Sequence, residues 1–248
     1  MSIDTEASLP RWHIAILIPA RDETRLLPRC LRSVKRARAT LPSHVTSDVV
    51  LVADRCVDTT LELARKHLRN DGVAVASSFG IVGKARALAA DIALGRYSGP
   101  PQRCWLANTD ADCELPPTWL ATQLALAQSG VEAVAGIVSV DTFDEHPAHV
   151  AARFRETYLI HDDGTHPHVH GANLGVRSDI YRMSGGWRGL STAEDHDLWN
   201  RLKSQGSNCC SVSSLQITTS GRIIGRAPQG FAGALAAQDS ITPDEAAA

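Results

Sequence analysis

Four apolar runs, separated by segments of helical pattern, constrain the fold of this chain most strongly. The runs occupy residues 13–19, 48–53, 73–76 and 104–107. Continuous apolar runs of this length are typical of strands buried on both faces. Because helices connect strands that run parallel, the alternation predicts an α/β fold. We expect a Rossmann-like, mostly parallel mixed sheet flanked by helices.

The second half of the sequence is less regular but continues the same kind of fold. The pattern predicts helices over 116–128 and 147–160, strands over 131–140, 171–177 and 209–219, and a helix that opens within 191–199. We expect a single domain over 1–237, with a first half at about 12–112 and a second half at about 113–237. The small, polar and acidic residues 238–248 are expected to form a disordered tail.

The composition excludes several classes of partner. The chain has 248 residues and a formal net charge of −2, which gives no general attraction to nucleic acid or to an anionic membrane. The longest uncharged span is broken by prolines and a glycine, so no membrane span is expected. Six cysteines form no Cys-x-x-Cys pair, which disfavours zinc and redox motifs and favours a cytoplasmic setting.

Polar residues follow each of the four predicted strands. Residues 19–23 follow the first, Asp54 the second, residues 80–84 the third, and Asp110 with Asp112 the fourth. In parallel sheets, ligands bind beyond the carboxyl ends of the strands. The sequence therefore predicts a ligand site at this edge of the sheet.

The pair Asp110 and Asp112 is the candidate cation site. Residues two apart in extended chain point the same way, so both carboxylates can face one cation that prefers oxygen ligands. An isolated Asp-x-Asp sequence is more often a polar turn. The position of this pair at the fourth strand end favours the cation site.

The segment 80–86 is the candidate phosphate site in the first half. Gly80 and Gly83 allow close backbone approach, and Lys84 or Arg86 can offset phosphate charge. The alternative, that the glycines shape a loop and the two bases are solvated, is equally favoured. No Gly-x-Gly-x-x-Gly or Walker-A sequence is present.

Two segments of the second half admit more than one interpretation. Residues 161–170 hold four histidines and two aspartates, which suit a flexible loop or an acceptor pocket better than a metal cluster. His170 is the favoured functional member. Ser191 and Glu194 match a capping box, and Asp195 is either an acid favoured by the helix dipole or a fixed base.

These pieces, taken together and in order, resemble the family 2 glycosyltransferases, which have the A-type glycosyltransferase fold and use nucleotide sugars. The resemblance covers about residues 13–222. Its motifs lie at 16–23, 53–60, 83–88, 110–112 (an Asp-x-Asp motif), 171–173, 185–187 and 194–198.

The resemblance implies a role for each candidate residue. Asp195 is expected to be the catalytic base, and Asp112 with Asp110 to hold Mg²⁺ or Mn²⁺. The expected donor-binding residues are Pro19, Ala20, Arg21, Glu23, Asp54, Lys84, Arg86, Asp110, Asp112 and Arg222. The expected acceptor residues are His170, Asn173, Trp187 and Glu194.

The implied reaction is transfer of a sugar from a nucleoside diphosphate sugar to an acceptor hydroxyl, with inversion. The expected partners are this donor, a hydroxyl acceptor that the sequence does not identify, and, as an open possibility, a second copy in a homodimer. One alternative is a binding protein of the same fold without transfer activity. Another is a sugar nucleotidyltransferase, which the absence of glycines at 19–23 disfavours.

Overall fold

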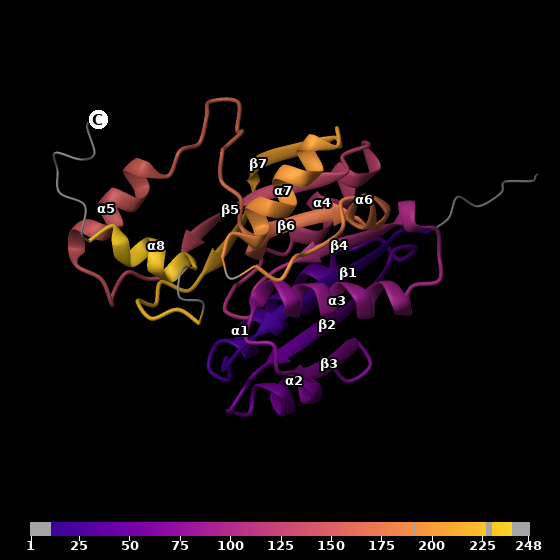
Figure 1. The fold of residues 1–248 in the computed structure, drawn as a ribbon, viewed down its shortest axis with the longest axis horizontal. Coiled ribbons are helices and arrows are strands. Elements are labelled where there is room, and N and C mark those ends of the chain that lie inside the picture. Colours follow the sequence, from indigo (N-terminus) through magenta and orange to yellow (C-terminus); the bar gives the residue numbers. More distant parts are fainter. Residues whose placement is uncertain (1–10, 191, 227–229, 240–248) are drawn as a thin grey trace, which may run out of the picture.

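The computed structural model describes residues 11–190, 192–226 and 230–239 (Figure 1). One seven-stranded sheet with the order β3-β2-β1-β4-β6-β5-β7 forms the centre of the molecule. The strands are β1 (His13–Ala20), β2 (Thr46–Asp54), β3 (Gly72–Ser77), β4 (Cys104–Asn108), β5 (Ala133–Val140), β6 (Leu174–Arg177) and β7 (Cys209–Thr219). The α-helices are α1 (Leu27–Ala39), α2 (Thr60–Leu68), α3 (Val82–Arg96), α4 (Trp119–Gln128), α5 (Ala148–Thr157), α6 (Ser178–Met183), α7 (Glu194–Ser204) and α8 (Phe231–Ala237).

The sheet is mixed in the way that the sequence predicts. Strands β1 to β4 are parallel to one another, and β7 is parallel to β5. Strand β6 runs antiparallel to both of its neighbours, β4 and β5. The prediction of a mostly parallel mixed sheet flanked by helices is confirmed.

Alternate residues of the central strand β1 face two separate cores. Ile14, Ile16 and Ile18 pack in one core with α1, α2 and α4. Ala15 and Leu17 pack in the other with α3, α6 and α7. Because successive side chains of a strand point to opposite faces, a strand covered on both sides must be apolar throughout. This explains the uninterrupted apolar runs.

Helices α5 and α8 lie side by side beyond the sheet (Figure 1). Phe154 and Phe231 meet edge to face, with ring centroids 6.0 Å apart. The sequence predicts a disordered tail from residue 238, but contacts with α5 hold its first two residues. His149 pairs with Asp239 at 2.9 Å, and Arg153 donates to the carbonyl of Gln238. Residues 240–248 lie outside the described part of the chain.

The sequence pattern misses the short helices α6 and α8, which are too short to show a helical repeat. Among the described helices, none has both the length and the apolar character needed to cross a bilayer.

A bulge in β7 explains the place of Asn173. The pairing of β5 with β7 shifts so that residues 213–215 have no partner on β5. The amide of Asn173 donates to the carbonyls of Ile137 and Leu215, at 2.8 and 2.7 Å, and accepts from the indole of Trp119 at 2.9 Å. Asn173 is fully buried. Its polar groups are therefore used in joining β5, β7 and α4.

Replacing Asn173 with alanine should destabilise the fold strongly. Asn173→Ala leaves two buried carbonyls and one indole N–H without their partner, and each such loss costs about 1–3 kcal/mol. Urea unfolding should show a loss of at least ~3 kcal/mol. Asn208→Ala is the control, because its side chain donates to the Gly130 carbonyl at an exposed site and its loss should cost under ~1 kcal/mol. Equal losses for the two variants would contradict this role of Asn173.

Candidate functional site

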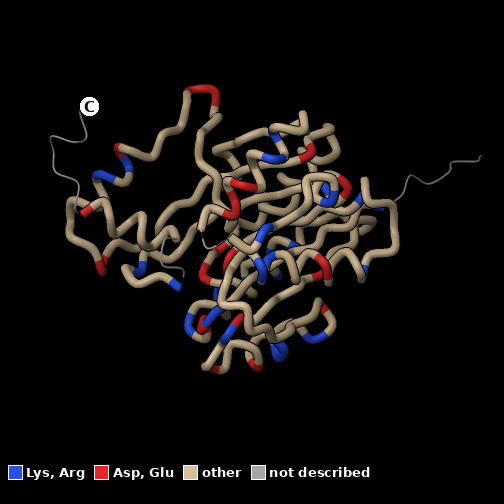
Figure 2. Tube along the Cα trace, in the orientation of Figure 1, with Lys and Arg blue, Asp and Glu red and all other residues tan. Residues whose placement is uncertain are grey.

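The loops that follow β1, β2 and β4 meet the start of α7 and the segment after β7. Figure 2 shows acidic and basic positions close together at the centre of the molecule, and the ion pairs described below join them. The predicted site residues that contact one another here are Glu23, Arg86, Asp110, Asp112, Trp187, Glu194 and Arg222.

Arg222 lies between two buried carboxylates, those of Glu23 and Asp112. Its Nη2 lies 2.7 Å from Glu23 Oε1 and 2.7 Å from Asp112 Oδ2. Arg226, which the sequence did not single out, lies 3.8 Å from the same Glu23 oxygen. Two buried carboxylates from different strand ends thus point at one position, which a cationic nitrogen fills.

A second arginine, Arg29, stabilises the turn that contains Asp110 and Asp112. Arg29 of α1 donates from Nη2 to the carbonyl of Asp112 at 2.8 Å and from Nη1 to Asp141 Oδ2 at 2.7 Å. Nothing in the local sequence signals this contact, since Arg29 lies in the first turn of an ordinary amphipathic helix.

Arg86 is buried between Asp110 and Glu194. Its side chain is only 3% exposed, and its Nη2 donates to Asp110 Oδ1 at 2.7 Å. Its Nε lies 3.6 Å from Glu194 Oε1, and its guanidinium lies 5.3 Å from the centre of the Trp187 ring. Arg86 therefore joins the aspartate motif to the start of α7. This burial argues against the direct diphosphate contact predicted for Arg86.

Two glycines allow this close packing around α3. A Cβ on Gly171 would lie 2.8 Å from Arg86 Nη2, and one on Gly83 would lie 2.2 Å from the carbonyl oxygen of Arg188. Both distances are too short for real side-chain contacts. The glycines of the motifs at 83–88 and 171–173 thus bring the Arg86 guanidinium and the segment before α7 together.

Helix α7 begins with two acids in different surroundings. Glu194 is 7% exposed, and burial raises its pKa while the charge of Arg86 opposes the rise. Asp195 Oδ2 accepts the Gly171 amide at 2.9 Å, and Oδ1 accepts the amide of His196 at 2.8 Å. The helix N-cap is Ala193, with a left-handed φ of 56°. The predicted cap was Ser191, which lies outside the described residues.

Asp54 ends β2 and is fixed by the strand beside it. Its Oδ1 accepts the hydroxyl of Ser77 at 2.8 Å and the amide of Phe79 at 2.7 Å. The Phe79 ring, which the sequence did not single out, is 44% exposed. Among the described residues, the second oxygen of Asp54 has no hydrogen-bond partner.

The remaining residues predicted to bind the sugar donor lie at the same edge of the sheet. Pro19 and Ala20 end β1 as buried strand residues, and Arg21 follows them, half-buried. Lys84 is exposed in the first turn of α3. Of the two bases suggested for phosphate binding, Lys84 is thus the accessible one.

The predicted acceptor residues separate into two groups. Gly171, the residue after His170, donates its amide to Asp195. The buried Trp187 packs against the guanidinium of Arg86. Glu194 pairs with Arg86. Asn173 does not belong with them: it is fully buried with its amide engaged, so the prediction that it contacts an acceptor is wrong in this structure.

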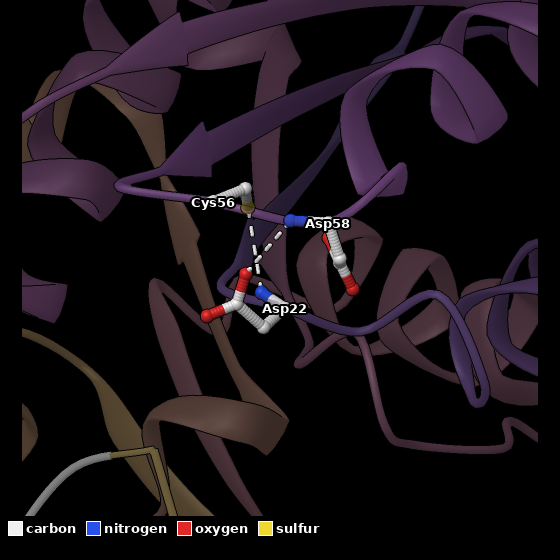
Figure 3. Close-up of side chains that lie close together, drawn as sticks. All are labelled: Asp22, Cys56 and Asp58. Atoms are coloured by element: carbon white, nitrogen blue, oxygen red, sulfur yellow. Dashed lines mark hydrogen bonds between the residues drawn. The ribbon is translucent and has the colours of Figure 1, made fainter.

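The described residues also contain one group of three potential metal ligands: Asp22, Cys56 and Asp58, whose ligand atoms lie within 4.8 Å of one another (Figure 3). Asp22 Oδ1 accepts the amide of Val57 at 2.7 Å. Burial would raise the pKa of Asp58, but hydrogen bonds from Thr24 and Thr60 lower it to about 2.

This group joins the loops after β1 and β2 rather than forming a good cation site. The carboxylates of Asp22 and Asp58 already accept backbone amides. Burial raises the pKa of Cys56, so its thiol stays neutral, and a neutral thiol is a poor ligand for a hard cation.

The carboxylates of Glu23 and Asp112 form a second candidate cation site, since both contact one Arg222 nitrogen. Burial raises the pKa of Asp112 well above its ordinary value, and the charges of Asp110 and Glu23 add to the rise while Arg222 opposes it. Glu23 and Asp112 meet at one Arg222 nitrogen, Asp110 pairs with Arg86, and carboxylate oxygens are what Mg²⁺ and Mn²⁺ prefer.

Comparison with known proteins identifies the family. The family model described as "Glycosyltransferase like family 2" matches residues 10–227, which is most of the chain. The chain belongs to this family. The predicted family is confirmed, and with it the enzyme class, glycosyltransferase. A search of curated proteins found no match.

Solved structures give the same fold. The glycosyltransferase chain resembles S. aureus TarS 1-349 with a TM-score of 0.63 and 15% identity, over 84% of this chain and 60% of that one. The TarS 1-349 complex with UDP-GlcNAc matches with a TM-score of 0.65 and 14% identity, over 88% of this chain and 61% of that one. The complex with UDP gives 0.62 and 14%, over 84% and 60%. The glycosyltransferase chain thus spans about three fifths of these TarS chains.

Removing Arg86 should cost far more stability than removing another arginine of the same helix. Arg86→Met leaves Asp110 and Glu194 without their buried cation, a loss of about 3–5 kcal/mol. Arg96→Met is the control: Arg96 is half-exposed and pairs with Asp48 at 2.8 Å, so its loss should cost under ~1 kcal/mol. Urea unfolding measures both. Losses of similar size would contradict the structural role given to Arg86.

Proposed function

We propose that the chain transfers a sugar from a nucleoside diphosphate sugar to an acceptor hydroxyl with inversion, and that Asp195 is the general base. One observation carries the proposal: Arg86 holds Asp110 and the first turn of α7 on a single buried guanidinium. This contact supports a site in which stabilisation of the leaving diphosphate and removal of the acceptor proton occur close together.

The donor occupies the edge formed by the strand ends. Asp54 accepts an N–H of the nucleobase through the oxygen that Ser77 and Phe79 leave open. The exposed Lys84 and the guanidinium of Arg222 supply positive charge near the diphosphate. UDP and UDP-GlcNAc occur in the TarS complexes of the same fold, so uridine compounds are the first donors to examine.

Asp112, Asp110 and Glu23 are the residues that would hold Mg²⁺ or Mn²⁺. A bound divalent cation neutralises charge that develops on a leaving diphosphate. In the described structure Arg222 contacts Glu23 and Asp112 at the point where their oxygens converge. Cation binding therefore requires that Arg222 leave Asp112, and its guanidinium then becomes available to the diphosphate.

Asp195 removes the acceptor proton. Two backbone amides, those of Gly171 and His196, fix the orientation of its carboxylate. A carboxylate offers about four lone-pair positions, so two remain for the acceptor hydroxyl. General base catalysis by a positioned carboxylate contributes on the order of 10²–10⁴-fold.

The cellular setting and assembly are part of the proposal. All six cysteines are free, as expected for a cytoplasmic enzyme, where thiols stay reduced. The acceptor supplies a hydroxyl and is otherwise open. A homodimer stays a prediction.

A thermal-shift panel tests the donor. Nucleoside diphosphates and nucleotide sugars, beginning with UDP and UDP-N-acetylglucosamine, are added with and without Mn²⁺. A ligand present at 100 times its Kd stabilises the folded state by about 2.7 kcal/mol. We expect stabilisation by a nucleoside diphosphate sugar that grows when Mn²⁺ is present. No shift with any compound of the panel would contradict the proposal.

Asp195→Asn should lower donor turnover on the order of 10²–10⁴-fold while donor binding persists, because the base is lost and the donor site is not. Turnover is measured as release of nucleoside diphosphate. Asp197→Asn is the matched control on the same helix, since Asp197 pairs with Arg201 and Arg188. A variant at Asp195 that keeps full turnover would refute the assignment.

Asp112→Ala should remove the part of nucleotide affinity that depends on Mn²⁺. Calorimetry with UDP, with Mn²⁺ or with chelator, measures this part. Glu114→Ala makes the same change of charge two residues away, at an exposed pair with Arg36, and should keep it. If Asp112→Ala still binds UDP more tightly with Mn²⁺, the cation lies elsewhere.

A further inference from the structure

Three rings of the histidine-rich loop (161–170) and the ring of Tyr158 lie nearly parallel to one another. The His168 ring lies 3.8 Å from the Tyr158 ring, 5.8 Å from His166 and 6.0 Å from His170, measured between centroids. The planes within each pair differ by no more than 19°. His170 also meets the Phe231 ring of α8 edge to face, with centroids 5.9 Å apart.

A chain of hydrogen bonds through Tyr158 determines where His170 carries its proton. The backbone amide of Val138 donates to the Tyr158 hydroxyl oxygen at 3.0 Å. The same oxygen lies 2.8 Å from His170 Nε2. The hydroxyl has one proton, and the described residues offer it no other acceptor. Tyr158 therefore donates to His170 Nε2, and the proton of the neutral ring must lie on Nδ1.

His170 lies close enough to Asp195 for the Asp195 charge to act on its ring. Nδ1 is the ring nitrogen nearer to its own main chain, and the next residue, Gly171, donates its amide to Asp195 Oδ2 at 2.9 Å. No group in the described ranges forms a hydrogen bond with His170 Nδ1. His170 Nδ1–H is thus a donor without a partner among the described residues, in the residue that precedes the amide bound to the proposed base.

Resting on the proposed transfer, we propose that Tyr158 is a positioning residue that fixes His170 as the Nδ1–H tautomer. His170 Nδ1–H then donates a hydrogen bond to an oxygen of the acceptor beside the hydroxyl that Asp195 deprotonates. The acceptor class that fits is a polyhydroxylated molecule, in which a second oxygen lies next to the attacking hydroxyl. No covalent bond changes at His170.

The surroundings keep His170 neutral, as this role requires. Burial lowers the pKa of His170 to about 4, an effect that Asp195 opposes and that His168, His166 and His196 reinforce. The imidazole is therefore uncharged at neutral pH, and its tautomer is set by Tyr158.

Nitrogen NMR of the histidine side chains tests the tautomer directly. A long-range proton–nitrogen correlation spectrum distinguishes a protonated ring nitrogen from one that accepts a hydrogen bond. The His170 signals are those that disappear in His170→Gln. We expect Nδ1 protonated and Nε2 unprotonated in the wild type, and a mixture of both tautomers in Tyr158→Phe. Tyr97→Phe, which removes only a bond to the Pro100 carbonyl, is the control. A protonated Nε2 in the wild type would overturn the proposal.

Two substitutions of His170 separate donation to the acceptor from support of the loop. The amide of asparagine replaces Nδ1, whereas the amide of glutamine replaces Nε2. With a polyol such as glycerol as the acceptor, sugar transfer from the donor found in the thermal-shift panel should lose roughly 2- to 10-fold in kcat in His170→Gln and Tyr158→Phe, the value of one hydrogen bond. His170→Asn should retain more activity, and KM for the donor should not change.

The opposite order, with His170→Gln the more active, would show that the bond to Tyr158 only supports the loop and would overturn the proposal. Failure of the proposed function is a separate outcome. It would appear as a panel without a donor, while the NMR experiment, which needs neither donor nor acceptor, still decides the tautomer.

Discussion

The buried guanidinium of Arg86 is the interaction on which the rest of the site depends. It donates to Asp110 at 2.7 Å and lies 3.6 Å from Glu194, the neighbour of Asp195. A buried cation needs anionic partners, and buried anions need the cation. Because neither side is stable alone, the aspartate turn and the start of α7 hold each other in place, although 84 residues of chain separate Asp110 from Glu194.

The topology makes this contact possible. Strand β4, which delivers the aspartates, pairs with β1 on one side and with the antiparallel β6 on the other. The antiparallel direction of β6 brings the loop before it, with His170 and Gly171, to the same edge as the aspartate turn. The residues proposed to bind donor and acceptor therefore lie near one another at the end of β4.

Local pattern predicts much of this structure and little of its connections. The apolar runs identify β1 to β4 because burial on both faces leaves a continuous local signal. The run 209–219 likewise predicts the bounds of β7, but its bulge has no local signal, so Asn173 was assigned to the acceptor site. The sequence left two alternatives for Arg86, phosphate binding or solvation, and neither includes burial between two carboxylates. Its burial arises from segments about 100 residues away.

The location of Mn²⁺ in a crystal grown with UDP tests the central claim, that the carboxylate group around Asp112 and the turn of Asp195 enclose one reaction centre. Anomalous diffraction identifies Mn²⁺ without assuming its ligands. We predict an anomalous peak at Asp112, with Arg222 moved away from that carboxylate and the diphosphate on the side facing Asp195. A peak at Asp22, Cys56 and Asp58, with the contact between Arg222 and Asp112 unchanged, would contradict it.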